Sequence, residues 1–98
     1  MSLPASAVHP SILDRAWELD PQVSVRPEAF GALLYHFGTR RLSFLKDRRL
    51  LSVVRSLADA PSARAACARA GVGDSAMDAF ESALARLADT AMVRERLP

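Results

Sequence analysis

The sequence of 98 residues is poor in the residues on which disulfides, metal sites and many catalytic sites depend. It has one Cys and two His, so it can form no internal disulfide and offers no cluster with metal-ligand spacing. The four Gly are scattered, which excludes a Gly-rich phosphate-binding loop. We therefore expect no enzyme, no metal and no cofactor.

Long apolar runs and targeting signals are also missing. No stretch approaches the roughly 20 apolar residues of a membrane span. The first ten residues have neither the basic nor the apolar region of a signal peptide. A single Cys fits a reducing compartment. We expect a soluble, cytoplasmic protein of one domain, because a chain this short cannot build two cores.

The few chemically versatile side chains have ordinary structural interpretations. His36 alternates with Leu34 in an apolar run, which is more typical of a half-buried sheet histidine than of a ligand or base. Cys67 has no close His or second Cys, so we expect it to fill the core. Trp17, the single Trp, is expected to close the open side of the core.

Three short segments predict an antiparallel β-meander over residues 23–45. Residues 23–26 alternate apolar and polar side chains, as a half-buried strand does. Two apolar runs, 32–37 and 42–45, flank a Gly-containing turn and predict a hairpin. Pro21 and Pro27 bracket the first strand and block it as an edge for further pairing. The third strand is therefore the open edge.

After Lys46 the apolar period changes from 2 to 3.6 residues, which predicts three helices over 47–60, 62–70 and 74–91. Asp47 and Ser62 are the expected N-caps of the first two helices, and Gly71 the stop of the second. For the third helix we expect Asp74 or Ser75 as the cap. Its apolar stripe consists of Met77, Phe80, Leu84, Leu87 and Ala91.

These elements predict an α+β, winged-helix-like domain in which a three-stranded antiparallel β-meander precedes a three-helix bundle. The domain is expected over residues 17–93. Residues 1–16 are expected to form a flexible tail, in which Ser11 and Asp14 have capping-box spacing and allow a short helical turn as far as Leu19. Residues 94–98 are expected to fray.

The middle third of the chain is strongly basic. Residues 40–69 carry eight basic residues against two acidic ones, whereas the flanking thirds are acidic. Such a surface attracts an acidic partner, although a plain set of solvated helix faces remains the alternative. The basic residues suited to gripping carboxylates near the third strand are Arg40, Arg41, Lys46, Arg48 and Arg49.

A winged-helix DNA-binding regulator is the main alternative function, because helix-turn-helix modules commonly place their last helix in the major groove. Here that helix carries four acidic residues against Arg86 alone, and would repel phosphates. The hairpin turn and the first two helices would have to contact the DNA instead. Nucleic acid is therefore the less favoured partner.

The third strand suits β-augmentation, in which an extended peptide pairs its backbone with an open sheet edge. It is last in the meander, contains no Pro and is followed by basic residues. The plain alternative is that Leu42, Phe44 and Leu45 are all core. Leu42 and Phe44 must point to one face, and Leu45 to the other.

Residues 20–48, DPQVSVRPEAFGALLYHFGTRRLSFLKDR, resemble the mycofactocin precursor-peptide chaperones, a group within the PqqD-like recognition elements of ribosomally made peptides. The resemblance covers most of the chain beyond residue 16, and GALLYHFGTRRLSFL is its most specific part. It implies a non-catalytic, winged-helix-like domain that binds the acidic leader of a precursor peptide by strand addition. It also implies that the peptide is presented to a radical S-adenosylmethionine maturase.

The resemblance assigns sites to this sequence as well. The peptide-binding strand would consist of Arg41, Leu42, Ser43, Phe44, Leu45 and Lys46. The groove wall would come from Met77, Phe80, Leu84 and Leu87. Arg40, Arg48 and Arg49 would steer the peptide electrostatically.

Overall fold

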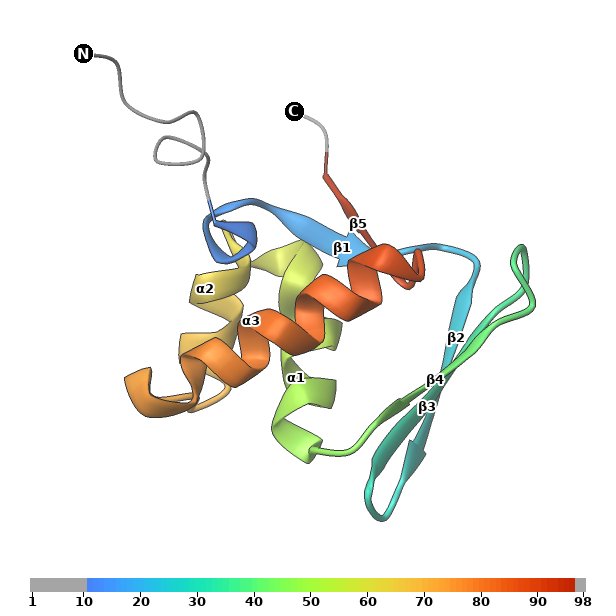
Figure 1. Cartoon of the computed structure of the whole chain (residues 1–98), viewed down its shortest axis with the longest axis horizontal. Helices are drawn as coiled ribbons and strands as arrows, with labels where there is room; N and C mark the ends of the chain where they lie inside the picture. The colour runs from blue at the N-terminus through green and yellow to red at the C-terminus, as the bar shows by residue number, and fades with distance from the viewer. Residues whose placement is uncertain (1–10, 97–98) are drawn as a thin grey trace.

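The structure, a computed structural model, describes residues 11–96, and the remainder of both expected tails lies outside the described residues. Its architecture is α+β, with a three-stranded antiparallel sheet beside three α-helices, which confirms the predicted fold class (Figure 1). The elements, in chain order, are η2 (Ile12–Asp14), β1 (Trp17–Leu19), β2 (Val23–Glu28), β3 (Gly31–His36), β4 (Leu42–Leu45), α1 (Arg48–Ser56), η3 (Leu57–Asp59), α2 (Ala63–Arg69), α3 (Asp74–Asp89) and β5 (Val93–Glu95).

The main sheet has the strand order β2-β3-β4, as the meander prediction requires. β2 continues through Pro27 to Glu28, two residues beyond the predicted end. A Pro is tolerated there because β2 is an edge strand with a partner on one side only. In the register of β3 and β4, Leu34 lies opposite Ser43, and Leu33 opposite Phe44. Opposite residues of an antiparallel pair share a face, so the register defines an inner face toward the helices and an outer face.

The caps of the first two helices are those predicted. Asp47 accepts a hydrogen bond from the backbone N–H of Arg49, and Ser62 accepts one from Ala65. The prediction for α3 is wrong, because its N-cap is Gly73, which has no side chain to accept a hydrogen bond. Asp74 instead lies in the first turn, where its negative charge suits the positive end of the helix dipole.

A second, two-stranded sheet joins the two ends of the described chain, and sequence analysis did not predict it. β1 pairs with β5 in antiparallel register, with Trp17 opposite Glu95. Within residues 11–16, which were expected in a flexible tail, Ile12–Asp14 form η2 and place Leu13 in the core at 2% exposure. The helical turn therefore ends at Asp14, and residues 94 and 95, expected to fray, belong to a strand.

The core lies between the inner face of the main sheet and the helices. Its largest fully buried side chains include Leu34 and Leu45 from the sheet and Leu57 and Leu84 from the helical part. Cys67 is fully buried among them, as expected. Trp17 is also buried, and its Nε1 donates to the carbonyl oxygen of Ile12 at 2.8 Å.

Candidate functional site

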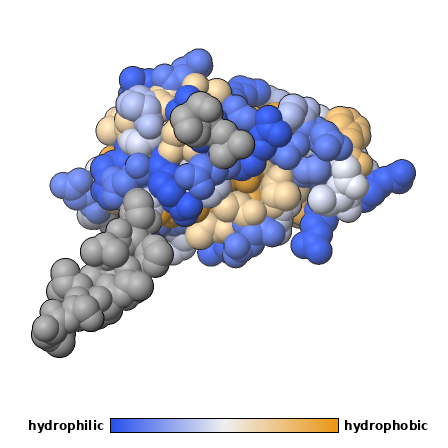
Figure 2. Space-filling model, turned by 90° about the horizontal axis from the view of Figure 1, so that it is seen from above, coloured by the Kyte–Doolittle hydropathy of each residue, from blue (hydrophilic) through white to orange (hydrophobic). Residues whose placement is uncertain are grey.

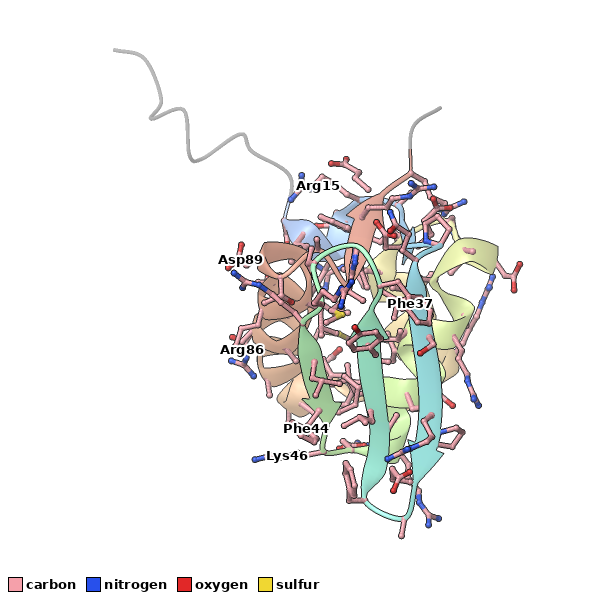
Figure 3. All side chains as sticks on the ribbon, turned by 90° about the vertical axis from the view of Figure 1, so that its right-hand side faces the viewer. Arg15, Phe37, Phe44, Lys46, Arg86 and Asp89 are labelled. Carbon is pink, nitrogen blue, oxygen red and sulfur yellow. The ribbon has the colours of Figure 1, made fainter. Side chains whose placement is uncertain are left out.

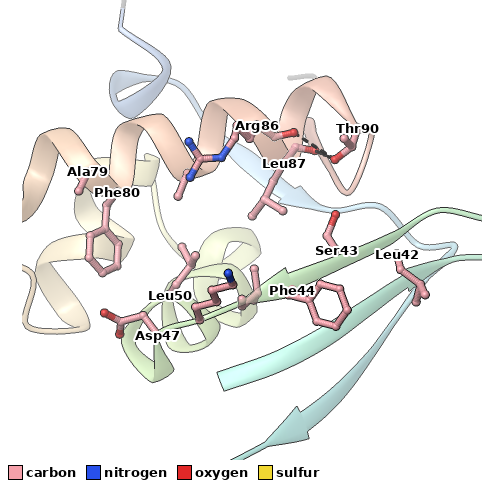
Figure 4. A pocket seen from close by; sticks show the side chains of 13 residues that line it. Leu42, Ser43, Phe44, Asp47, Leu50, Ala79, Phe80, Arg86, Leu87 and Thr90 are labelled. Carbon is pink, nitrogen blue, oxygen red and sulfur yellow. Dashed lines mark hydrogen bonds between the residues drawn. The ribbon is translucent and has the colours of Figure 1, made fainter. Parts of the chain in front are cut away.

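A groove of about 600 Å³ lies between β4 and α3 (Figure 4). One wall comes from β4 and the residues that follow it, and the other from one side of α3. The lining residues are Leu42, Ser43, Phe44, Leu45, Lys46, Asp47 and Leu50 on the first side and Ala79, Phe80, Ala83, Arg86, Leu87 and Thr90 on the second.

The edge of β4 that faces away from β3 has no partner strand in the described sheet. The backbone N–H of His36 donates to the carbonyl oxygen of Arg41 at 3.0 Å, which marks these two residues as a hydrogen-bonded position of the ladder. Bonded and non-bonded pairs alternate along an antiparallel ladder. Ser43 and Leu45 therefore direct their backbone groups toward β3, whereas Leu42 and Phe44 direct theirs toward the open edge.

Gly31 fixes where β4 ends and α1 begins. Its φ is +152°, and a Cβ added to it would lie 2.0 Å from the carbonyl oxygen of Leu45. Only a residue without a side chain allows the backbone of β3 to approach so closely. The adjacent Asp47 then starts α1, so this contact positions the end of the groove next to Lys46 and Asp47.

The wall from α3 includes a stripe with two small side chains, Ala79 and Ala83. Ala79, Ala83, Arg86 and Thr90 follow one another at intervals of three or four residues, so they form one stripe along the helix. The two Ala leave room for a side chain inserted from outside. At the end of the stripe, the Thr90 hydroxyl donates to the carbonyl oxygen of Arg86 at 3.0 Å (Figure 4).

The structure brings together most of the predicted site residues but not all of them. Five of the six strand residues line the groove, while Arg41 is exposed at the start of the strand. Phe80 and Leu87 line it as well. Leu84 is 2% exposed within the core, and Met77 packs against the core without reaching the groove.

The geometry of α3 explains why the predicted and the observed residues of the groove wall differ. The apolar stripe identified in the sequence faces the core, and only Phe80 and Leu87 at its border also reach the groove. The rest of the α3 wall comes from the neighbouring stripe. Ala79 and Ala83 were overlooked because Ala in a helix is unremarkable by itself. The available signal was two small residues four apart, followed by the single basic residue of the helix.

The strand residues divide between the two faces as predicted. Leu45 is 1% exposed and belongs to the core, and Ser43 shares its face. Leu42 and Phe44 lie on the outer face and are 55% and 59% exposed. Their exposure excludes the plain alternative that all three apolar residues of β4 serve the core.

The groove is bordered by positive charge. Neither Lys46 nor Arg86 forms an ion pair with a carboxylate in the part of the chain that the structure describes. Asp47 is neutralised by Arg49, whose Nη2 lies 3.1 Å from Oδ2, and this hydrogen bond lowers the pKa of the carboxyl. The Arg49 guanidinium also covers the ring of Phe80, 5.2 Å from its centroid.

The other basic residues expected to steer a peptide differ in whether their side chains already have hydrogen-bond or ion-pair partners within the fold. Arg40 and Arg41 are exposed at the hairpin turn and have no ion-pair partner among residues 11–96. Arg48 donates to the carbonyl oxygen of Ala29 at 3.2 Å, and Arg49 is engaged with Asp47. The two turn arginines are therefore more available to an incoming molecule than the two helix arginines.

His36 orders the hairpin turn. It is 4% exposed, and its Nδ1 accepts hydrogen bonds from the backbone N–H groups of Gly38 and Thr39 at 3.0 and 3.1 Å. Its Nε2 lies 3.6 Å from Oδ1 of Asp20. The hydrogen bonds of Nδ1 and the burial of the ring agree with the expected role of a sheet histidine.

Within residues 11–96 no three His, Cys, Asp or Glu side chains lie close enough to one another to hold a metal ion. Across the same residues, every helix is too short or too polar to cross a membrane.

Comparison with known proteins identifies the family. The sequence model of the peptide chaperone MftB family matches residues 16–94. The chain belongs to this family. The resemblance of residues 20–48 to the mycofactocin peptide chaperones is therefore confirmed. The name of the MftB family describes a chaperone and not an enzyme, in agreement with the sequence prediction.

Curated relatives support the MftB assignment. The peptide chaperone MftB of Mycobacterium tuberculosis (strain ATCC 25618 / H37Rv) is 59% identical over 83 residues, which span 85% of this chain and 76% of the relative. That of Mycobacterium ulcerans (strain Agy99) is 61% identical over 80 residues, 82% of this chain and 73% of the relative. No solved structure matches significantly.

Proposed function

We propose that this protein binds the leader of a ribosomally made precursor peptide as an additional strand on β4. It then presents the peptide to a radical S-adenosylmethionine maturase in mycofactocin biosynthesis, in the cytoplasm where such peptides are made. The observation that carries the proposal is the unpartnered edge of β4 beside a groove, in a member of a peptide chaperone family.

The backbone of β4 supports strand addition. Leu42 and Phe44 direct their N–H and C=O groups toward the open edge, and these groups can pair with an extended peptide. Alternate side chains of the added strand would then point toward α3. The space beside Ala79 and Ala83 suits an apolar side chain, with Phe80 and Leu87 as neighbours.

The charges favour an acidic leader. Lys46 and Arg86 border the groove, and Arg40 and Arg41 lie at the end of the hairpin beside β4. Charges at the rim of a binding site accelerate association more than they strengthen the complex. We therefore expect the basic residues to increase the rate of leader capture, and the groove to determine how long the leader stays.

Chemical-shift mapping with isotope-labelled protein and the synthetic leader tests the binding mode. The expected perturbations cover residues 42–46 and 79–90, with new protection from amide exchange at Leu42 and Phe44. Perturbation confined to residues 47–70 would exclude strand addition on β4.

A competition experiment separates the proposed function from DNA binding. The protein is titrated with the leader, with a scrambled leader of the same charge, and with duplex DNA at moderate salt. The proposal requires the native leader to bind more tightly than the scrambled one. Tight binding of the duplex with no response to the leader would favour the DNA-binding regulator.

A further inference from the structure

The outer face of the main sheet carries an apolar patch that extends well beyond the groove. The large hydrophobic side chains exposed in the described chain are Phe30, Phe37, Leu42 and Phe44, with exposures of 46%, 60%, 55% and 59%. All four lie in the two hairpins of the main sheet, and Leu33 and Tyr35 share the outer face by register. We call these six residues the outer-face patch.

The patch is continuous along the sheet. At one end, the ring of Phe30 lies 6.4 Å from that of Phe44, and the two rings line a shallow hollow with Lys46. At the other end, Phe37 meets Tyr35 edge-on at 5.1 Å. Tyr35 lies opposite Leu42 in the register, which connects the two ends.

No described element covers this face. In Figure 3 the sheet faces the viewer with the helices behind it, and α3 lies beside the edge formed by β4. Figure 2 also shows hydrophobic side chains at the right-hand end of the molecule, where Figure 1 places the sheet. A peptide in the groove would therefore leave most of the outer-face patch free for a second molecule, because only Leu42 and Phe44 of its six residues also line the groove.

Basic side chains border the patch. Arg40 lies in the turn that follows Phe37, Lys46 shares the hollow with Phe30 and Phe44, and Arg48 donates to the carbonyl oxygen of Ala29, next to Phe30. The carboxylates next to these residues are themselves paired, Glu28 with Arg26 at 3.0 Å and Asp47 with Arg49 at 3.1 Å. A partner for this surface must combine an apolar centre with a border of carboxylates.

A second copy of this chain does not meet that requirement. In a two-fold dimer the same patch is present on both subunits, so the basic border of one copy would face the basic border of the other. Like charges brought together at an interface oppose association. The charge pattern thus favours a different protein over self-association.

We propose that the maturase docks on the outer-face patch while the leader occupies the groove on the other side of β4. This proposal rests on the proposed function, because it names the surface used for presentation. Leu42 and Phe44 would take part in both contacts. Their backbone groups lie at the edge of β4 that would pair with the leader, and their side chains belong to the outer-face patch. The strand that holds the leader would therefore contact the enzyme that modifies the peptide.

The test compares binding of two ligands to a double variant, Phe30→Ser with Phe37→Ser. Both side chains are exposed and neither lines the groove, so circular dichroism should show an unchanged fold. We expect the affinity for the leader to stay within about twofold and the affinity for the maturase to fall at least about tenfold, since exposed aromatic side chains are enriched at protein interfaces and a few side chains carry most of the binding energy. Unchanged maturase affinity would overturn the inference.

A cross-linking experiment provides an independent measurement that does not depend on removing hydrophobic contacts. Because Cys67 is fully buried, a Cys introduced by Phe37→Cys can be labelled selectively with a photoreactive group. We expect this position to cross-link to the maturase. Ser75→Cys, exposed at the start of α3 and distant from the sheet in Figure 1, is the matched control and should not.

Other outcomes point to other occupants. If the wild-type protein is a dimer that the double variant converts to monomers, the patch is a self-association surface and the inference is wrong. It is equally wrong if the patch binds a single-stranded oligonucleotide, which basic residues and exposed aromatic rings can do. Absence of leader binding by the wild-type protein would instead contradict the proposed function, so the two failures are distinguishable.

Discussion

Phe44 lies directly opposite Leu33 in the register of β3 and β4, at a non-bonded position of the ladder. Its backbone N–H is therefore directed away from β3 and toward the groove. Ser43, one residue earlier, directs its N–H to Leu34 instead. Neighbouring residues of one short strand thus serve two different purposes, one within the sheet and one at its edge.

Phe44→Pro should weaken leader binding without unfolding the sheet, because Pro removes an N–H that the sheet itself does not use. Loss of one backbone hydrogen bond, about 1 kcal/mol, predicts a decrease in affinity of roughly fivefold to tenfold. Phe44→Ala is the control, since it removes the same ring and retains the N–H. Equal affinities of the two variants in calorimetric titration would contradict strand addition at Phe44.

Ser43→Pro should behave differently, because it removes a bond of the β3–β4 ladder. We expect a lower midpoint in urea denaturation and a disturbed circular dichroism spectrum even without peptide. A stable Ser43→Pro variant with normal leader binding would show that the assignment of inward and outward N–H groups is reversed.

Ala79→Trp should block the groove. Ala79 is exposed and lines the groove, so a large side chain there occupies the space intended for the peptide without overpacking the core. We expect leader affinity to fall at least about tenfold, equivalent to roughly 1.4 kcal/mol. Ser82→Trp, also exposed on α3 but outside the groove lining, should bind the leader normally. Equal effects of both substitutions would exclude a specific role for the groove.

Arg86→Glu should slow association of an acidic leader and reduce its dependence on salt, because rim charges act mainly on the association rate. Stopped-flow measurements at several ionic strengths check this. Arg55→Glu changes the charge of the protein equally at an exposed position on α1 outside the groove. If both variants slow association to the same extent, net charge rather than the groove border is responsible.

Gly31→Ala should destabilise the fold strongly. The added Cβ would meet the carbonyl oxygen of Leu45, which belongs to backbone and cannot move aside as a flexible side chain does. We expect a loss of about 2 kcal/mol or more in the free energy of unfolding, measured by urea denaturation. Gly73→Ala, where a Cβ would meet nothing within 4 Å, should cost less than about 1 kcal/mol.

Cys67 should be unreactive in the folded protein. Burial raises the pKa of its thiol, so the neutral form is favoured over the reactive thiolate. The sign of the pH dependence follows from this raised pKa. The contribution of the Cys67 thiol to the free energy of unfolding is complete at pH values below the pKa that the thiol has in the unfolded chain. It is lost as pH rises through the higher pKa of the folded state. At pH 9 we expect iodoacetamide to modify the unfolded chain far faster than the native one. Equal rates would contradict the burial of Cys67.

The hairpin and the caps of α1 and α2 could be predicted because each has a local chemical cause. The apolar runs 32–37 and 42–45 flank a Gly-containing turn, and Asp47 and Ser62 can hydrogen-bond the first turns of their own helices. β1 and β5 could not be predicted, because strands of three residues show no period and their pairing joins distant segments. The prediction of the N-cap of α3 was wrong because the observed cap, Gly73, has no side chain that could indicate a helix start.

The groove wall illustrates a limit of hydrophobic patterns. Leu84 belongs to the strongest apolar stripe in the sequence, and for that reason it is buried in the core rather than exposed to a ligand. Phe80 and Leu87 of that stripe do line the groove, but the remaining wall includes Ala79 and Ala83, which carry little signal in a sequence. A stripe of small residues indicates the wall of a groove only when β4 is known to lie beside it.

The pairing of β1 with β5 also determines the order in which the domain can fold. Trp17 and Glu95 lie opposite each other although almost the whole described chain separates them. Of the strand pairings in the fold, this one therefore has the largest entropic cost of loop closure. Local hairpins and helices form before such distant contacts. We therefore expect the two-stranded sheet to form last and to open first, which makes it the place where hydrogen exchange should reveal the earliest unfolding.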